Sequence, residues 1–291
     1  MEILYLGPEG AFSHDAALEL VARSGLDAAV SPQVNVEAVV RTVAKAKDDA
    51  IIGLIPYYNF LEGLVQEHLD LIYEFRLQIF GVIRLPIRLA AGAFEASPAA
   101  TSEIFSHPKA LAQVSEFIQA TFRDATIVPV NSTAEAARMV AAQKHGVAIA
   151  SERALDKYAV PILARDVGNR RQGKANFTDF FMVGHGGGAS RIDLGAPNRS
   201  IVAIVPQIDR LGLLADILGQ FRFYELDIAK IHSRPAIDTI NGAGEPQMFY
   251  LEVACAPDAA PLMRCADAIR YSFSHDKSSG DPVRVMGGFR I

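Results

Sequence analysis

The sequence predicts an α/β protein, because short apolar strands alternate with segments of helical period along most of its 291 residues. The first apolar stretch, residues 3–6, is followed by a turn at 7–10, and Ser13 is placed to cap the helix that comes next. Strands that alternate with helices in this way indicate a mostly parallel sheet.

The same alternation continues to residue 165, with Ser132 and Thr133 placed at the start of an alanine-rich helix. We expect strands at 50–55 (ending at Pro56), 104–105, 127–130 and 146–150, and helices at 61–75, 109–121, 134–143 and 152–158. Residues 79–93 carry further apolar runs, broken by Pro86. Ligands of open α/β sheets usually bind beyond the carboxyl ends of the strands, so polar loops there are candidate sites.

A glycine-rich polar stretch at 185–197 offers little to bury, and we expect the main domain boundary there. After it, the predicted order of elements is βαββαβ, the split unit of ferredoxin-like folds. These elements are expected at 200–206, 212–224, 227–233, 248–254, 257–274 and 283–286. The predicted organisation is a first domain over 1–185, a linker over 186–198 and a second domain over 199–291.

Composition excludes several classes of protein. The formal net charge is −5 and no dense block of basic residues is present, so nucleic acid is not an expected partner. The two cysteines, Cys255 and Cys265, have no second Cys or His pair at metal-binding spacing, which favours reduced, buried thiols over zinc. No leader-like start or membrane-spanning run is evident, so we expect a soluble, cytoplasmic protein.

Three short motifs could carry chemistry, and each also has a purely structural interpretation. The first, Gly7 to Ser13, could hold an anion at a helix start or form a plain turn. In the second, residues 176–183, the Thr178 hydroxyl stands at a strand entrance, where it could also cap the strand. The third, Ser106-His107-Pro108 followed by Gln113, could be an ordinary helix cap, with His107 structural.

Together, and followed by a βαββαβ unit, these motifs resemble those of the prephenate dehydratase family, enzymes of phenylalanine biosynthesis with a C-terminal ACT regulatory domain. The resemblance covers nearly the whole chain. It rests on Gly7 to Ser13 (GPxGxFS), Pro56 to Gly63 (P-x-E-N-S/T-x-x-G), Ser106 to Gln113 (SHPxxxxQ), Ser132-Thr133-Ala134 (STA), Thr178-Asp179-Phe180 (TRF), Gly212 to Ala215 (GALV) and His232 to Pro235 (ESRP).

The resemblance implies two α/β subdomains of the periplasmic-binding-protein type with a cleft between them, and prephenate as the substrate. Thr178 would donate a hydrogen bond to the departing hydroxyl group, because an aliphatic hydroxyl is too weak an acid to give up its proton at pH 7. No metal or organic cofactor is implied. The residues implied to bind substrate are Ser13, Asn59, Ser106, Gln113, Ser132, Thr133 and Phe180.

For the second domain, the resemblance implies an amino-acid effector, L-phenylalanine above all, bound between the ACT units of a homodimer or homotetramer. The implied effector-binding residues are Gly212, Leu213, Leu214, Ala215, His232, Ser233, Arg234 and Pro235. His232 stands where the family has Glu. Because histidine is mostly neutral at pH 7, attraction for an ammonium group is reduced or the effector differs.

Three positions in the first domain depart from the family pattern. Asp179 replaces a cation, and Tyr58 and Phe60 replace a carboxylate and a small hydroxyl residue. If Asp179 faced the cleft, it would weaken binding of a dianion, and Asp179→Arg would then raise the efficiency of a dehydratase. The departures also leave two alternatives open: a non-aromatising prephenate decarboxylase that retains the hydroxyl group, and a non-catalytic amino-acid sensor.

Overall fold

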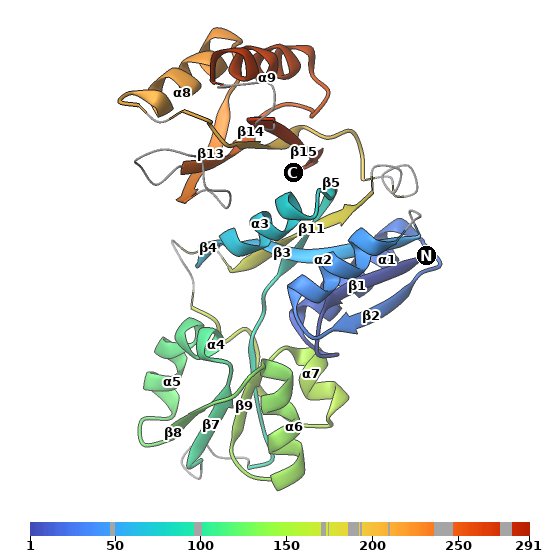
Figure 1. The fold of residues 1–291 in the computed structure, drawn as a ribbon. Helices are drawn as coiled ribbons and strands as arrows, with labels where there is room; N and C mark the ends of the chain where they lie inside the picture. Colours follow the sequence, from blue (N-terminus) through green and yellow to red (C-terminus); the bar gives the residue numbers. More distant parts are fainter. Residues whose placement is uncertain are drawn as a thin grey trace. The chain divides into compact units, whose positions relative to one another are not determined.

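The computed structural model describes the chain except residues 47–49, 96–100, 170–172, 174, 186–191, 193, 209, 236–246 and 274–280. The chain divides into two compact units (Figure 1). Unit 1 comprises Met1–Leu71 and Ile83–Phe181, and unit 2 comprises Ile72–Val82 and Met182–Ile291. The chain passes between them in α3 (Gln66–Glu74), in β5 (Gln78–Pro86) and in β11 (Phe177–Gly184).

The first sheet of unit 1 contains the parallel strands β1 (Glu2–Leu6), β2 (Ala29–Gln33) and β3 (Ile51–Asn59), with β1 in the middle. Strand β11 lies next to β3, and the short β4 (Gly63–Leu64) pairs with the end of β3. Helices α1 (Phe12–Ser24) and α2 (Val36–Lys45) pack on this sheet. Valines on one face of α2, at positions 36, 39, 40 and 43, are all buried, which explains its docking.

The second sheet of unit 1 has the strand order β10-β6-β9-β7-β8. Its strands are β6 (Ala90–Ala93), β7 (Glu103–Ser106), β8 (Thr126–Pro129), β9 (Val147–Ala150) and β10 (Ile162–Ala164). Its helices are α4 (Pro108–Gln113), α5 (Ser115–Thr121), α6 (Thr133–Gln143) and α7 (Glu152–Lys157). Two apolar cores enclose this sheet, and alanines of α6 and β9 fill one of them, where small side chains allow close packing.

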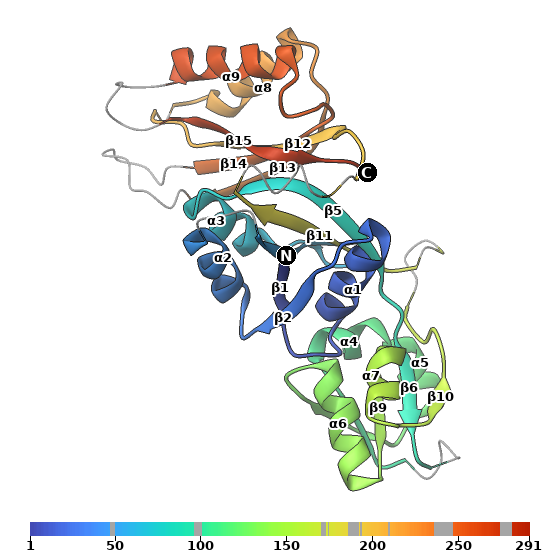
Figure 2. The same ribbon diagram turned by 90° about the vertical axis from the view of Figure 1, so that its right-hand side faces the viewer.

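Unit 2 has the predicted βαββαβ order. It consists of β12 (Arg199–Ile204), α8 (Leu213–Phe223), β13 (Ile228–Pro235), β14 (Gln247–Val253), α9 (Ala260–Phe273) and β15 (Val283–Phe289). The sheet order is β13-β14-β12-β15, and both helices cover one face of it (Figure 2). The core lies between that face and the helices, and it includes the buried Cys265.

Three elements of the first unit differ from expectation. The strand predicted to stop at Pro56 continues to Asn59, and the proline is tolerated because the pairing of β3 with β1 ends at Leu54, before Pro56. The helix expected over 61–75 begins only at Gln66, after β4. The helix expected over 109–121 is two helices, since Val114 leaves helical geometry at φ −122° and ψ 16°.

Ser13 does not cap α1. The residue at the N-cap is Ala11, whose side chain accepts no hydrogen bond, and Ser13 lies inside the first turn of the helix. By contrast, Ser132 caps α6 as predicted, because its Oγ accepts from the amide of Glu135 at 3.0 Å. His107 caps α4 through its ring nitrogen, which accepts from the amide of Lys109 at 3.2 Å, so its structural interpretation holds.

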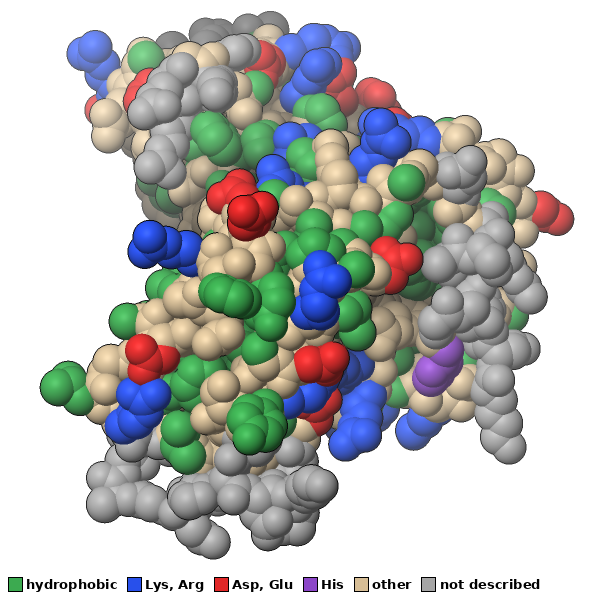
Figure 3. Space-filling model, turned by 90° about the horizontal axis from the view of Figure 1, so that it is seen from above, with side chains coloured by type: hydrophobic (Ala, Val, Ile, Leu, Met, Phe, Trp, Pro, Cys, Tyr) green, Lys and Arg blue, Asp and Glu red, His purple; other side chains and the backbone are tan. Residues whose placement is uncertain are grey.

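The surface and the thiols fit the composition. On the face seen in Figure 3, lysine and arginine side chains are interspersed with acidic and apolar ones.

Both cysteines are free thiols. The predicted burial is confirmed for Cys265, whereas Cys255 is only half-buried. Burial raises the pKa of the Cys265 thiol to about 12. Over the described ranges, no helix has both the length and the apolar character needed to cross a bilayer.

Candidate functional site

Asn59 and Thr178 meet where β3 ends and β11 begins. Asn59 is the last residue of β3, and Thr178 is the second residue of β11 and is 9% exposed. The Nδ2 of Asn59 donates a hydrogen bond to Oγ1 of Thr178 at 2.9 Å. The fold therefore brings together two of the predicted site residues.

The direction of this hydrogen bond is set by the loop that follows Asn59. Its Oδ1 accepts from the amides of Leu61 at 3.0 Å and Glu62 at 3.1 Å. Because amides only donate, the carboxamide oxygen must face them, and Nδ2 must face Thr178. Thr178 Oγ1 is consequently the acceptor, and its own proton is left to be donated to another group.

Gln113 reaches the same region from α4. Its Nε2 donates to Oε1 of Glu62 at 2.7 Å, and its Oε1 accepts from Nδ2 of Asn176 at 3.1 Å. Lys109, one turn earlier on the same helix, forms an ion pair with Glu62 at 3.1 Å. These contacts connect α4 to the loop after β3 and to the segment before β11, so Gln113 contacts chain neighbours of both Asn59 and Thr178.

Among the remaining residues predicted to bind substrate, Ser106 and Ser132 make structural hydrogen bonds, and binding of substrate by this set stays a prediction. Ser106 is fully buried, and its Oγ donates to the carbonyl of Ile149 at 2.6 Å. Ser132 caps α6, and Thr133 is the first residue of that helix. Ser13 and Phe180 are buried at 7% and 2% exposure. The Ser106 hydroxyl thus joins β7 to β9, and the Ser132 hydroxyl caps the start of α6.

The loop Gly7 to Ser13 joins the two sheets of unit 1 through α7. Glu9 pairs with Lys157 at 2.7 Å, Ser151 Oγ donates to the carbonyl of Gly10 at 3.4 Å, and Asp15 forms an ion pair with Arg153. Burial raises the pKa of Asp15 to about 6, against the opposing effect of Arg153. Gly10 adopts a φ of 86°, which explains the glycine at this turn.

Arg84 is a residue of this region that no motif contains. Its Nε and Nη2 donate to the two carboxylate oxygens of Asp179 at 2.7 and 2.9 Å, and Asp179 is only 1% exposed. These hydrogen bonds raise the pKa of Arg84 above its usual value. Asp179 is therefore a buried carboxylate whose charge is paired with that of Arg84. The only signal in the sequence was a single charge within the apolar run 79–87.

In unit 2, the predicted effector-binding residues lie on α8 and β13. Gly212 precedes α8 with a φ of 81°, a conformation that favours glycine. His232 to Pro235 form the end of β13, where His232 pairs with Tyr250 of β14. Burial, together with Lys230, lowers the pKa of His232 against the opposing effect of Glu252. The histidine ring is therefore neutral near pH 7.

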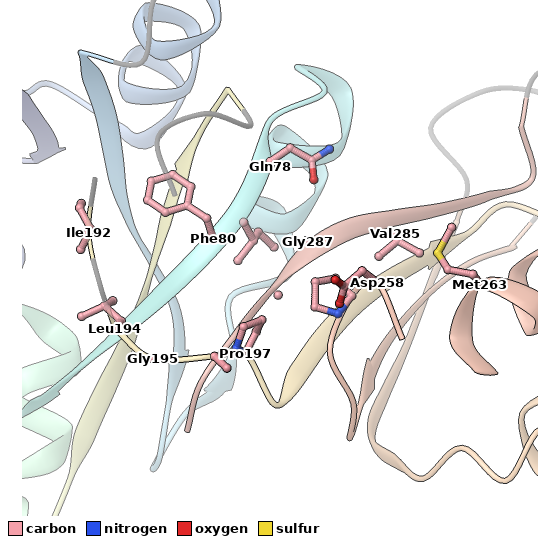
Figure 4. A pocket seen from close by; sticks show the side chains of 14 residues that line it. Gln78, Phe80, Ile192, Leu194, Gly195, Pro197, Asp258, Met263, Val285 and Gly287 are labelled. Atoms are coloured by element: carbon pink, nitrogen blue, oxygen red, sulfur yellow. The ribbon is translucent and has the colours of Figure 1, made fainter. Parts of the chain in front are cut away.

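A separate cavity of about 770 Å³ lies within unit 2 and contains none of the predicted site residues. Figure 4 shows Phe80 and Leu194 toward one end of it and Val285 and Met263 toward the other. Asp258 is among the residues that line this cavity. Over the part of the chain that the structure describes, no group of three His, Cys, Asp or Glu side chains is arranged to hold a metal ion.

A family model for prephenate dehydratase matches residues 3–187, which include both sheets of unit 1. The chain belongs to the prephenate dehydratase family. The prephenate dehydratase of Bacillus subtilis is 30% identical over 306 residues, a match that covers 100% of this chain and 99% of that one. The bifunctional chorismate mutase/prephenate dehydratase of Aquifex aeolicus is 30% identical over 239 residues, and the match covers 81% of this chain and 62% of that longer protein.

Among solved structures, the prephenate dehydratase of Arthrobacter aurescens in complex with L-Phe superposes with a TM-score of 0.80. The two sequences are 21% identical, and the match covers 100% of this chain and 90% of the other. This likeness confirms the predicted fold: the α/β arrangement of two sheets in the first part, followed by a βαββαβ unit.

The positions that depart from the prephenate dehydratase pattern meet at one aromatic ring. The ring of Phe60 stacks on that of Phe177 at 5.3 Å, and the ring of Tyr58 lies 6.2 Å from it. The guanidinium of Arg84 lies 3.9 Å from the centre of the Phe177 ring while it holds Asp179. The changes at 58, 60 and 179 thus form one physical cluster around Phe177 and Arg84.

Proposed function

We propose that this protein is a prephenate dehydratase, which converts prephenate to phenylpyruvate, CO2 and water. The observation that carries the proposal is the hydrogen bond from Asn59 to Thr178, since its direction leaves the Thr178 proton to be donated. In the reaction, the bond from the ring to its carboxylate breaks and its electron pair enters the ring. The C4–O bond breaks with its pair on oxygen, which takes one proton from solvent and leaves as water.

Thr178 assists the departing hydroxyl group by donating a hydrogen bond to its oxygen. Negative charge develops on that oxygen as the C4–O bond breaks, so the hydrogen bond is stronger in the transition state than in the ground state. By analogy with single oxyanion-hole donors, its contribution is about 2–4 kcal/mol. The Thr178 hydroxyl is far too weak an acid to give up its proton completely at pH 7, and hydrogen-bond donation does not require it to do so.

Substrate binding uses neutral donors around this pair. Gln113 Nε2 has a second hydrogen beyond the one given to Glu62, and in this proposal it donates that hydrogen to a substrate carboxylate. The other residues that we propose to bind the substrate lie in strands or at helix starts of unit 1. They are Ser13, Asn59, Ser106, Ser132, Thr133 and Phe180.

Incubation of the purified protein with prephenate, followed by product analysis, tests the proposal. Phenylpyruvate formed at a rate proportional to enzyme concentration supports the dehydratase. A dihydro-hydroxyphenylpyruvate product, in which CO2 is lost and the hydroxyl group is retained, would reject the dehydratase. It would indicate instead the decarboxylase that Tyr58, Phe60 and Asp179 suggested. Unchanged substrate would favour a non-catalytic amino-acid sensor.

For the second part of the chain we propose an ACT domain at 199–291, joined by a linker at 186–198 to a catalytic domain at 1–185. The βαββαβ order of unit 2 and the glycine at the start of α8 support this domain. The relative from Arthrobacter aurescens is described in complex with L-Phe, which suggests an aromatic amino acid as effector. A neutral His232 predicts weaker attraction for its ammonium group than a carboxylate would give.

The same proposal includes self-association as a homodimer or homotetramer. Large apolar side chains of unit 2 are unusually exposed, with Leu211 at 100%, Tyr271 at 92% and Phe223 at 76%. Calorimetry with phenylalanine, tyrosine and tryptophan, activity assays with each, and light scattering test both claims. Heat of binding together with a changed rate supports regulation, whereas no heat, no rate change and a monomeric mass would reject it.

A further inference from the structure

Glu62, in the loop after β3, contacts two of the residues that we propose to act on the substrate. Its backbone amide donates to Oδ1 of Asn59 at 3.1 Å, and its Oε1 accepts from Nε2 of Gln113 at 2.7 Å. Its other carboxylate oxygen, Oε2, pairs with Nζ of Lys109 at 3.1 Å. The motif at 56–63 leaves this position unspecified. A residue outside the predicted site thus joins the loop that holds Asn59 to the helix that carries Gln113.

We propose that Glu62 is a positioning residue that fixes the orientation of the Gln113 carboxamide, an inference that rests on the proposed function. In that function, Nε2 of Gln113 donates its second hydrogen to a substrate carboxylate. A carboxamide donates from its nitrogen and accepts at its oxygen, and a half-turn exchanges the two with little change in shape. Only the orientation that presents the nitrogen can bind an anion, so the contact that selects this orientation controls the binding.

The carboxylate of Glu62 selects that orientation. An ionised carboxylate only accepts hydrogen bonds, so Nε2 of Gln113 must face it and Oε1 must face away. The opposite orientation would place the Gln113 oxygen against the Glu62 oxygen, and neither of these two atoms can donate. The hydrogen bond between the two side chains is charge-assisted, and its length of 2.7 Å is typical of that class.

The same constraint extends to Asn176, which comes just before β11. Oε1 of Gln113 accepts from Nδ2 of Asn176 at 3.1 Å, so the nitrogen of Asn176 must face α4. Asn176 is 6% exposed, and its backbone carbonyl accepts from the amide of Ile87 at 2.9 Å, so its place is fixed by the neighbouring chain. Glu62 therefore determines the direction of two successive hydrogen bonds, its own with Gln113 and that of Gln113 with Asn176.

Lys109 balances the negative charge that Glu62 brings near a site for an anion. An unbalanced carboxylate would repel a substrate that carries two carboxylates. Lys109 lies one helical turn before Gln113, and its ion pair with Glu62 is formally neutral. The two side chains are 65% and 33% exposed, so water screens the remaining field. Repulsion by Glu62 and positioning of Gln113 by Glu62 predict opposite effects on substrate affinity when the carboxylate is removed.

Steady-state kinetics of Glu62→Ala and Glu62→Gln test this inference. Glu62→Ala removes the acceptor, so Gln113 can turn its oxygen toward the substrate, and KM for prephenate should rise about tenfold. The kcat should stay within about threefold of the parent, because the backbone amides of the loop still hold Asn59. Glu62→Gln keeps an oxygen that accepts from Gln113, so its KM should rise by less than about threefold.

A double-mutant cycle shows whether Glu62 acts through Gln113. Gln113→Ala should itself raise KM, and the addition of Glu62→Ala should then change KM by less than about twofold, because no carboxamide is left to orient. Glu37→Ala is the matched control, since Glu37 accepts from Arg41 on α2 and should leave KM unchanged. Urea unfolding of the same cycle needs no activity, and the double variant should lower the midpoint by less than the sum of the single shifts.

A KM of Glu62→Ala within about twofold of the parent, or below it, would overturn the inference, because the carboxylate would then act by repulsion or not at all. Equal impairment of Glu62→Gln and Glu62→Ala would overturn it too, as would a full additional rise in KM when Glu62→Ala is added to Gln113→Ala. If the parent forms no phenylpyruvate, the proposed function fails instead. The unfolding cycle then still decides whether Glu62 and Gln113 interact.

Discussion

Asn59 donates to Thr178 at 2.9 Å across a separation of 119 residues, and the amides of Leu61 and Glu62 fix the direction of that hydrogen bond. The arrangement leaves the Thr178 proton to be donated to another group. Because the Asn59 side chain donates to it, the Thr178 hydroxyl can donate its own proton only to a different group.

Thr178→Ala should lower kcat on prephenate by at least about tenfold, with a smaller change in KM, because the lost contact matters most in the transition state. Thr178→Ser keeps the hydroxyl group and should retain most of the activity. Initial rates over a range of prephenate concentrations measure both variants. A kcat of the alanine variant within twofold of the parent would remove Thr178 from the mechanism.

Asn59→Asp should reduce kcat about as much as Thr178→Ala. The introduced carboxylate can still accept from the two loop amides, but it cannot donate, so Thr178 would give its proton to that carboxylate and not to the substrate. Asn35→Asp is the matched control, since Asn35 caps α2 only as an acceptor, at 2.8 Å from the amide of Ala38. Parent-like kinetics of Asn59→Asp would contradict the assigned direction of the hydrogen bond.

Asp179→Arg should lose activity and stability rather than gain activity, which reverses the expectation from sequence. The new guanidinium would occupy a buried position beside Arg84, with its counter-charge removed. Breaking a buried ion pair in this way costs about 3–5 kcal/mol. Urea unfolding measures the loss, and the charge-swapped Arg84→Asp/Asp179→Arg variant should recover part of it. An Asp179→Arg protein as stable as the parent would contradict the buried pairing.

Asp15 should make the folded state less stable as pH rises. Its pKa is raised from 3.8 to about 6 by burial, so the folded protein binds more protons than the unfolded chain between those values. The stability that the protonated carboxyl provides is present below about pH 4 and is lost as pH rises through about 6. The Asp15→Asn protein should lack this pH-dependent part of the stability. The Asp124→Asn protein should keep it, because Asp124 is exposed. Thermal melts from pH 4 to 7 would show parallel curves for parent and Asp15→Asn if the carboxyl were not perturbed.

Gly287→Ala should destabilise unit 2. Gly287 has a φ of 120°, and a Cβ there would lie 1.9 Å from the carbonyl oxygen of Ile79, its partner in β5. We expect a loss of at least about 2 kcal/mol in the free energy of unfolding. Gly219→Ala in α8 is the opposite control, because a Cβ there meets no atom within 4 Å and alanine favours a helix by about 0.5–1 kcal/mol. Equal stability of the two variants would contradict the close approach.

The sequence alone determined the order of the elements, because periodicity is a local property. The βαββαβ order of unit 2 and the strand–helix alternation of unit 1 follow from apolar spacing, and Asn59, Gln113 and Thr178 follow from short motifs. Local signals also had limits. Proline at position 56 suggested an end to β3 that the neighbouring strands override, and nothing in the spacing showed the break at Val114.

Only the tertiary structure decided the charge at the site. Arg84 and Asp179 are 95 residues apart, and a single charge in an apolar strand gives no sign of its partner. In the sequence, Asp179 stands where the family has a cation, and the aromatic residues at Tyr58 and Phe60 were read as changes unrelated to it. Packing of β3, β5 and β11 brings these residues to one ring, Phe177, beside which Arg84 from a neighbouring strand pairs with Asp179. This pairing depends on the distance between the two strands, and that distance arises only when the chain folds.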